Sequence, residues 1–321
     1  MKNLFAVSAF AYVFSLLSIH LCLPQEINSS PPLSNPKREP FKLACMHLPN
    51  AIQIHSKVIS GGQPDGEQAF RELKQLGVRT IVSVDGAKPE VALAKEYGMR
   101  YVHLPHGYDG IGPERRSELA RAVRDLNGPI YIHCHHGKHR SPAAAAVACV
   151  SAGFIEPEAT IGILKLAGTN ENYKGLFASV ASSKRIEDAV LNNLRAEFPE
   201  TAKLTPIAEA MVAMEQVYER VEHFANSGWS PTKAHGDFDP AHEALLLREH
   251  FKELLRLESV SKRPEGFHRI LKNSEADAQS LEAAIRHWNP TTKTATVPKS
   301  VAELLERINA NCTSCHRQFR D

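Results

Sequence analysis

The sequence predicts an α/β domain, with a parallel-rich sheet flanked by helices, followed by an all-α four-helix bundle. Two patterns give this prediction. Between residues 41 and 196, short apolar strand-type segments alternate with amphipathic helical segments, as they do in sheets whose strands are joined by helices. From about residue 206 the strand signals stop, and four amphipathic helical segments follow one another, as in an antiparallel bundle.

Composition sets the limits of the interpretation. The chain has 321 residues, which is long enough for two domains, and it is 43% hydrophobic and 23% charged, which is typical of globular proteins and not of disordered ones. The formal net charge is only +2. We therefore expect no nucleic-acid partner, and any preference for anions must come from a local site.

The N-terminal residues read as an export signal. Residues 1–24 begin Met-Lys-Asn and continue as an apolar run through Leu23, which predicts a signal peptide and a periplasmic or otherwise exported protein. The run is also long enough to span a bilayer, so an uncleaved, membrane-anchored form stays an alternative. A lipoprotein is disfavoured because Leu21, not a small residue, precedes Cys22. Residues 25–40 are rich in Ser and Pro and predict a linker.

The elements of the first domain, residues 41–196, follow in order. Strands are expected at residues 57–60, 79–84, 101–104 and 130–132, where apolar and β-branched residues cluster. Helices are expected at residues 65–76, 89–97 and 113–126, and again between 151 and 193 with a break at 169–175. In such a sheet, ligands bind where the parallel strands end. The loop after residue 132 is therefore the first place to look for a site.

That loop carries reactive side chains at a spacing that suits binding of an anion. Cys134 and Arg140 stand six positions apart, and Ser141 and Pro142 suit the first turn of the helix that follows. A loop in front of a helix N-terminus turns its backbone N–H groups inward and forms a nest for an oxyanion. The same field favours a thiolate, and an arginine can hold two phosphate oxygens. The arrangement suits attack of sulfur on phosphorus.

The pattern His-Cys-x5-Arg-Ser resembles the signature of the protein tyrosine phosphatase superfamily, especially its compact dual-specificity-like members. The resemblance implies a phosphatase-like domain over residues 41–196, acting on a phosphorylated protein or small molecule. It implies that Cys134 forms a phosphocysteine, that Arg140 binds the phosphate and that Ser141 assists the second step. The residues expected to bind the phosphate are His135, His136, Gly137, Lys138, His139 and Arg140.

The same resemblance implies an aspartic acid that protonates the leaving oxygen. Asp109, in the loop after the strand at residues 101–104, holds the corresponding place in the chain order. The Trp-Pro-Asp form of the family is absent, so Asp85, at the end of the preceding strand, stays a rival. Either residue can also serve only to stabilise a turn.

The histidines of the loop leave further alternatives open. With Lys138 they make the mouth basic when protonated, which suits a polyanionic substrate or simply a solvated surface. Four histidines also suggest a metal site, although a loop whose N–H groups face inward offers a cation no acceptors. In an oxidising compartment Cys134 is exposed to disulfide formation, with Cys45 and Cys149 as available partners.

Residues 197–205 predict a linker, and residues 206–321 predict the bundle. Apolar stripes at helical spacing run over residues 207–225, 247–255, 267–288 and 301–308. The last stripe continues into Cys312-Thr313-Ser314-Cys315-His316, and Cys-x-x-Cys-His is the attachment signature of c-type haem. Two thiols at this spacing add to the haem vinyl groups, and the histidine becomes an iron ligand.

A haem signature near the end of a four-helix bundle resembles the cytochrome c prime family, and only residues 312–320 carry a specific match. The resemblance implies covalent haem c on Cys312 and Cys315, His316 as the proximal ligand and pairing of bundles into a homodimer. Met211 or Met214 of the first bundle helix is a candidate distal ligand, although both also suit core packing. A zinc site and an unmodified dithiol are weaker alternatives.

Two hypotheses of function follow. The first is an exported cysteine-dependent phosphatase that hydrolyses a phosphomonoester and carries a haem that regulates it. The second is a periplasmic electron-transfer or gas-sensing haem protein, with a redox partner, whose phosphatase-like domain only binds anions. In the first, control would pass from the haem to the oxidisable thiolate of Cys134.

Overall fold

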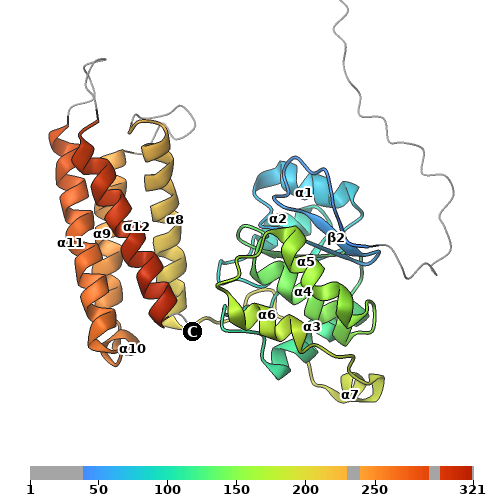
Figure 1. Ribbon diagram of the computed structural model, residues 1–321. Coiled ribbons are helices and arrows are strands. Elements are labelled where there is room, and N and C mark those ends of the chain that lie inside the picture. The colour runs from blue at the N-terminus through green and yellow to red at the C-terminus, as the bar shows by residue number, and fades with distance from the viewer. Residues whose placement is uncertain (1–38, 230–238, 289–296, 320–321) are drawn as a thin grey trace, which may run out of the picture. The chain divides into compact units, whose positions relative to one another are not determined.

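The computed structural model describes residues 39–229, 239–288 and 297–319 (Figure 1). The predicted signal or anchor at residues 1–24, and the linker at 25–40 as far as residue 38, lie outside the described residues. No helix within the described ranges is both long and apolar enough to cross a bilayer.

A six-stranded mixed sheet forms the framework of the first domain. Its strands are β1 (Phe41–Lys42), β2 (Ile52–His55), β3 (Val58–Gly62), β4 (Thr80–Ser83), β5 (Arg100–His103) and β6 (Ile130–Cys134), in the spatial order β1-β2-β3-β6-β4-β5. The four strands from β3 to β5 in this order are parallel, whereas β1 and β2 add an antiparallel edge. The predicted parallel-rich sheet is confirmed. The two edge strands escaped prediction because β1 has two exposed residues and a short turn joins β2 to β3.

Alternating side chains on the strands build two cores, one on each face of the sheet. On β6, Ile130 and Ile132 join one apolar cluster, while Tyr131 between them joins the other. The helices α1 (Gly66–Gln75) and α2 (Val91–Glu96) cover the Tyr131 face. The opposite face carries α3 (Pro113–Asp125), α4 (Arg140–Ser151), α5 (Thr160–Ala167) and α6 (Lys174–Ala181). This period-two burial on both faces is why the central strands read as continuous apolar runs.

Helix α4 is the most deeply buried helix of this domain. Every residue from Ser141 to Ser151 is buried, and six of its side chains are small alanine or serine groups between Ser141 and Ala148. Small side chains let a helix approach a sheet closely. Since β6 is central and α4 is its direct continuation, the loop between them is held by the best-packed part of the fold.

The segment from residue 197 to 205, predicted as a linker, is fastened to β5. The backbone N–H of His103 donates to the Pro199 carbonyl at 2.8 Å, and the N–H of Ala202 donates to Nδ1 of His103 at 3.1 Å. Nδ1 is therefore the acceptor, so Nε2 carries the proton and donates to the Asp85 carbonyl at 2.7 Å. A short helix, α7 (Asp188–Asn193), precedes this segment.

The second half of the chain is helical, as predicted. Its four long helices are α8 (Pro206–Asn226), α9 (Pro240–Arg256), α11 (Glu265–His287) and α12 (Lys299–Phe319), with the one-turn α10 (Glu258–Ser261) between α9 and α11. Thr205 and Asp239 cap α8 and α9 by accepting hydrogen bonds from first-turn N–H groups. Close packing runs from α8 to α9, from α9 to α11 and from α11 to α12, whereas α8 and α12 do not pack as closely on each other.

Candidate active site

The loop that follows β6 is tied to its surroundings by its carbonyl groups. The His135 carbonyl accepts from the N–H of Gln63, the Gly137 carbonyl from the side-chain amide of Asn50, and the Lys138 carbonyl from the hydroxyl of Thr169. These bonds measure 3.0, 2.8 and 2.6 Å. With three of its carbonyls bound to neighbouring segments, the loop leaves its N–H groups available to its own interior, as an anion nest requires.

Gly137 is the residue that allows the loop to close this tightly. Its φ is +71°, and a Cβ at this position would lie 2.4 Å from the backbone nitrogen of Gly62 and 2.5 Å from the carbonyl carbon of Gly61. Both atoms belong to β3, which cannot move without breaking its pairing with β6. A side chain here would force the loop away from the strand.

Cys134 ends β6 and is buried, with 3% of its surface exposed. Its Sγ–H donates to Oγ of Ser141 at 3.3 Å, and the Ser141 hydroxyl donates to the Gly61 carbonyl at 2.9 Å. The structure thus brings together the predicted nucleophile and the predicted assisting hydroxyl. Cys45, Cys134 and Cys149 are all free thiols, so Cys134 has no disulfide with either of its two available partners.

Arg140 starts α4 with its Nε buried and without a hydrogen-bond partner in the structure. Burial lowers the pKa of its guanidinium, but the electrostatic effects of Tyr108, Cys134, Asp85 and Glu215 together outweigh burial, and the pKa is raised overall. The guanidinium carbon lies 4.6 Å from the centre of the Tyr108 ring. A buried, charged donor with an unused N–H beside an anion nest is suited to bind a phosphate oxygen.

Tyr108 and Tyr173, which were not predicted as site residues, pack against Arg140 and His139. The Tyr108 ring lies 4.6 Å from the Tyr173 ring, and the Tyr173 ring lies 4.6 Å from that of His139. Tyr108 comes from the loop before α3 and Tyr173 from the turn before α6. The sequence shows that Tyr108 lies in a loop rich in glycine and proline. It does not show the contact of Tyr108 with Arg140, which is 32 positions away.

The two candidate acids occupy different surroundings. Asp109 is exposed and follows Tyr108, and its backbone carbonyl lies so close to Gly175 that a Cβ there would be 1.9 Å from it. Asp85 is buried, and its Oδ1 accepts from the Ala87 N–H at 2.9 Å and from the Ser83 hydroxyl at 3.3 Å. Its Oδ2 is buried without a partner. Asp109 is thus accessible to solvent, whereas Asp85 is held in a turn.

Two buried histidines near the loop stay neutral. Burial lowers the pKa of His133 to about 4, and its Nε2 lies 2.6 Å from the Tyr101 hydroxyl. Burial likewise lowers the pKa of His106 to about 4, with a smaller contribution from the neighbouring Arg140, and its Nδ1 donates to the Gly107 carbonyl. Neither is placed to bring positive charge to the phosphate at neutral pH.

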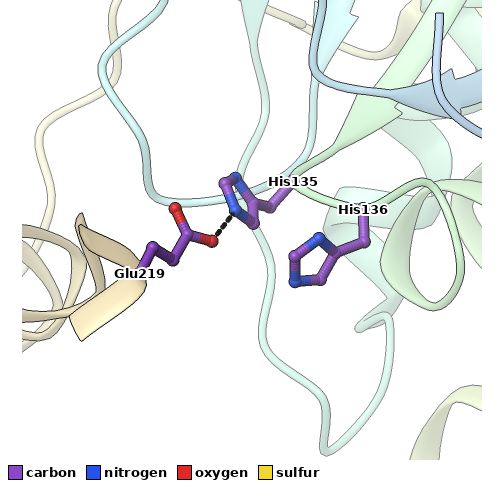
Figure 2. A group of neighbouring side chains, drawn as sticks. All are labelled: His135, His136 and Glu219. Atoms are coloured by element: carbon purple, nitrogen blue, oxygen red, sulfur yellow. Dashed lines mark hydrogen bonds and ion pairs between the residues drawn. The ribbon is translucent and has the colours of Figure 1, made fainter. Parts of the chain in front are cut away.

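Of the other predicted phosphate-binding side chains, His135 points to a carboxylate. Its Nε2 hydrogen-bonds to Oε1 of Glu219 on α8, and His136 lies beside it (Figure 2). This bond raises the pKa of His135 and lowers that of Glu219. Lys138 is exposed. The sequence suggested no part for Glu219, because its spacing on α8 is that of an ordinary polar face.

In the bundle, the predicted haem residues share the last turns of α12. Cys315 is buried, Cys312 is half-buried and His316 is exposed, and both cysteines are free thiols. Burial raises the pKa of Cys312 to about 11, with further contributions from Cys315 and from Glu222 on α8. Of the two methionines, Met214 is buried and Met211 is half-buried, both within the apolar cluster that contains the cysteines.

Comparisons with known proteins give distant likenesses only. No family model matches the chain, and no curated protein matches it. Among solved structures, TpbA of P. aeruginosa in complex with pTyr is 19% identical over 45% of this chain and 91% of its own, with a TM-score of 0.38. A DUF442 protein of Shewanella putrefaciens is 20% identical over 44% of this chain and 93% of its own, with a TM-score of 0.36.

The core catalytic domain of the PP-IP phosphatase SIW14 of S. cerevisiae, in complex with citrate, is 13% identical over 46% of this chain and 93% of its own, with a TM-score of 0.39. All three identities are below 25% and all three TM-scores are below 0.5. Likenesses this distant do not say what the present chain does. The chemistry has to be argued from its own residues.

Proposed function

We propose that this protein is a cysteine-dependent phosphatase that hydrolyses a phosphomonoester through a phosphocysteine intermediate. The observation that carries the proposal is the loop between β6 and α4. There a free thiol, a hydroxyl 3.3 Å from it and a buried arginine with an unpartnered Nε surround a nest whose carbonyls are bound outward. Such a site holds a tetrahedral dianion directly against sulfur.

Cys134, Arg140 and Ser141 have separate parts in the two steps of hydrolysis. The Cys134 thiolate attacks phosphorus and forms an S–P bond while the bond from phosphorus to the leaving oxygen breaks. Arg140 and the loop N–H groups bind the other three oxygens, whose charge is spread in the transition state. In the second step water attacks phosphorus, the S–P bond breaks, and the Ser141 hydroxyl, next to Sγ, donates to the departing sulfur.

Asp109 is the proposed general acid, which gives its proton to the leaving oxygen and later accepts one from water. Support comes from its exposure and from its neighbour Tyr108, which lies on Arg140. Asp109→Asn should lower kcat by about 10²–10⁴-fold for alkyl phosphates, which need protonation, and much less for an aryl phosphate with a good leaving group. Asp85→Asn, at a carboxylate bound in a turn, is the matched control. The reverse pattern would make Asp85 the acid.

The direct test is phosphate release from p-nitrophenyl phosphate by the full chain, with added thiol. Cys134→Ser should lower kcat/KM by at least about a thousandfold, because the nucleophile is lost. Cys45→Ser, at a half-buried thiol in the same domain, is the control and should leave the rate unchanged. Equal rates for wild type and Cys134→Ser would contradict the proposal.

A second proposed function is covalent binding of haem c by the bundle. On α12, Cys312, Cys315 and His316 fall within about 100° of the helix circumference, because successive residues turn by about 100°. The side of Cys312 faces α8, since Glu222 acts electrostatically on its thiol, and α8 and α12 are the neighbours that do not pack closely. The residues therefore fit a flat group held by two thioethers, with His316 as a ligand and Met211 or Met214 as a candidate for the other face. Haem iron would supply one-electron transfer or binding of a small gas.

This second function is tested by the absorption spectrum and mass of protein made in a host that matures c-type cytochromes. We expect one haem per chain that survives denaturation, and we expect the double variant Cys312→Ser/Cys315→Ser to carry none. A wild-type chain without covalent haem would remove the cofactor from the proposal. Attachment of haem would also support export, because it takes place outside the bacterial cytoplasm.

The phosphatase proposal and its alternative differ in whether the α/β domain hydrolyses a phosphate ester or only binds anions. If the α/β domain only binds anions, phosphate should bind with no turnover, and the protein would serve electron transfer or gas sensing with a redox partner. If haem regulates the phosphatase, the rate should change on addition of dithionite in the absence of thiol. The proposal also includes export or anchoring by residues 1–24 and pairing of two chains through the bundle. The mass of the mature chain tests whether residues 1–24 are removed, and the mass of the protein in solution tests pairing.

A further inference from the structure

Three metal-binding side chains meet beside the phosphate loop. His135 and His136 follow Cys134 directly, and Glu219 comes from α8, 84 positions beyond His135 (Figure 2). One ligand atom from each residue lies within 4.8 Å of the other two. Within the described part of the chain, this is the one place where three such groups gather.

The donor set indicates which ion would fit. Two imidazoles and one carboxylate form the ligand set of open zinc sites, in which water or a substrate holds the fourth position. Calcium and magnesium prefer sites made wholly of oxygen. In a tetrahedral zinc site with bonds of 2.0–2.1 Å, ligand atoms lie about 3.3 Å apart. The observed ligand atoms lie within 4.8 Å of one another, so rotation of the side chains would bring them to this spacing when an ion binds.

The arrangement of the rings is suited to the same purpose. The His135 and His136 rings lie 4.3 Å apart at an angle of 61°, so they meet edge to face and are not stacked. The His135 side chain is 30% exposed and that of Glu219 is 38% exposed, so an ion can enter from solvent. Glu215, one turn before Glu219 on α8, adds a second carboxylate to the electrostatic surroundings of both histidines.

The loop interior and this cluster do not compete. The anion nest uses the backbone N–H groups of the loop, whereas the cluster uses two side chains of the loop and one of α8. In the structure without an ion, His135 and Glu219 are joined by a hydrogen bond, and an ion would take the place of the shared proton. A carboxylate brought next to a phosphate-binding loop is otherwise unfavourable for anion binding.

We propose that His135, His136 and Glu219 form a binding site for a divalent transition-metal ion of the Zn²⁺ type, which joins the phosphate loop to α8. The site neutralises Glu219 and leaves at least one coordination position open beside the phosphate loop. It does not depend on Cys134 as nucleophile, so its test can succeed or fail separately from that of the phosphatase.

The test is titration of the full chain with ZnCl₂ by isothermal calorimetry, followed by zinc-edge X-ray absorption of the bound ion. We expect one Zn²⁺ with nitrogen and oxygen neighbours near 2.0 Å. His136→Ala and Glu219→Gln should each weaken binding at least about tenfold. Both side chains lie at the surface, and the melting temperature of each variant shows whether it has folded.

The controls separate this site from the thiols and from chance surface binding. His242→Ala, at an exposed histidine of α9, and Cys134→Ser should bind Zn²⁺ as wild type does. Unchanged binding in folded His136→Ala and Glu219→Gln would overturn the proposal. A zinc environment with sulfur near 2.3 Å that disappears in Cys315→Ser would also overturn it, because the ion would then sit on α12.

Discussion

The two cysteine motifs of this chain are supported in different ways by the fold. Around Cys134, segments far apart in sequence converge: Asn50, Gln63 and Thr169 each hold one carbonyl of the loop. Around Cys312 and Cys315 the spacing is set by a single helix, and the two thiols lie in an apolar cluster. The first motif is a loop held by three distant segments, whereas the second is two free thiols one turn apart on one helix.

Because of this difference, the two motifs need different tests. The phosphate loop can be judged from geometry, because its chemistry needs only the groups that are present. The Cys-x-x-Cys-His segment depends on a group that has to be added, so its proposal still rests mainly on the spacing in the sequence. Variants of the loop should therefore change turnover and leave haem content alone, and variants on α12 should do the reverse.

After Cys134 and Asp109, the largest effect on turnover is expected at Arg140. Arg140→Lys keeps the charge but loses the planar fork that holds two oxygens, and kcat/KM should fall by about 10²–10³-fold. Haem content, read from the absorption spectrum, should not change. Arg79→Lys, at an exposed arginine of the same domain, is the control. A parallel loss of haem would show that the two regions are not independent.

Gly137 and Gly77 form a matched pair for the loop itself. Both have positive φ, +71° and +76°, but a Cβ at Gly137 would strike the β3 backbone and one at Gly77 would meet nothing within 4 Å. Gly137→Ala should displace the loop and lower kcat by about a hundredfold. Gly77→Ala should cost about 1 kcal/mol of stability with normal kcat. Equal kcat in both variants would contradict a preformed loop.

Acid should weaken the α/β domain through His106. Its folded pKa of about 4 lies below the usual 6.5, so the unfolded chain takes up the proton first as the pH falls. The stability that neutral His106 contributes is full above pH 6.5 and is lost toward pH 4, a change of about 3 kcal/mol. Urea unfolding at several pH values measures it. His106→Asn should remove the share due to His106 and leave the similar share due to His133, and His47→Asn should leave the dependence unchanged. A slope unaffected by His106→Asn would place the acid sensitivity elsewhere.

The smallest expected effect concerns the ring on Arg140. Tyr108→Leu removes a cation–π contact worth about 1 kcal/mol, so kcat/KM should fall about fivefold. Tyr173→Leu leaves that contact in place and should matter less. If Tyr173→Leu has the larger effect, the tyrosines act on the substrate and not through Arg140.

Local patterns predicted the parallel strands, the four bundle helices and the cysteine loop, because period-two and helical spacings and the Cys134–Arg140 interval all lie within short stretches. The antiparallel edge escaped because β1 has only two residues, both exposed, and because a short turn joins β2 to β3. Tyr108, Tyr173 and Glu219 escaped because their parts depend on contacts between distant segments, on which a single sequence carries no signal. Spacing leaves Asp109 and Asp85 as rivals, and the proposal of Asp109 draws on its exposure and on the burial of Asp85, which spacing does not give.

The central claim is the covalent intermediate, and a rapid-mixing experiment tests it most directly. With an aryl phosphate, Ser141→Ala should release about one aryl alcohol per chain in a fast burst and then turn over slowly, because breakdown of the S–P bond loses its assisting hydroxyl. Mass spectrometry of the quenched protein should locate the phosphate on Cys134. A burst that persists in the double variant Cys134→Ser/Ser141→Ala would contradict the account. So would a Ser141→Ala protein that turns over at the wild-type rate and shows no burst.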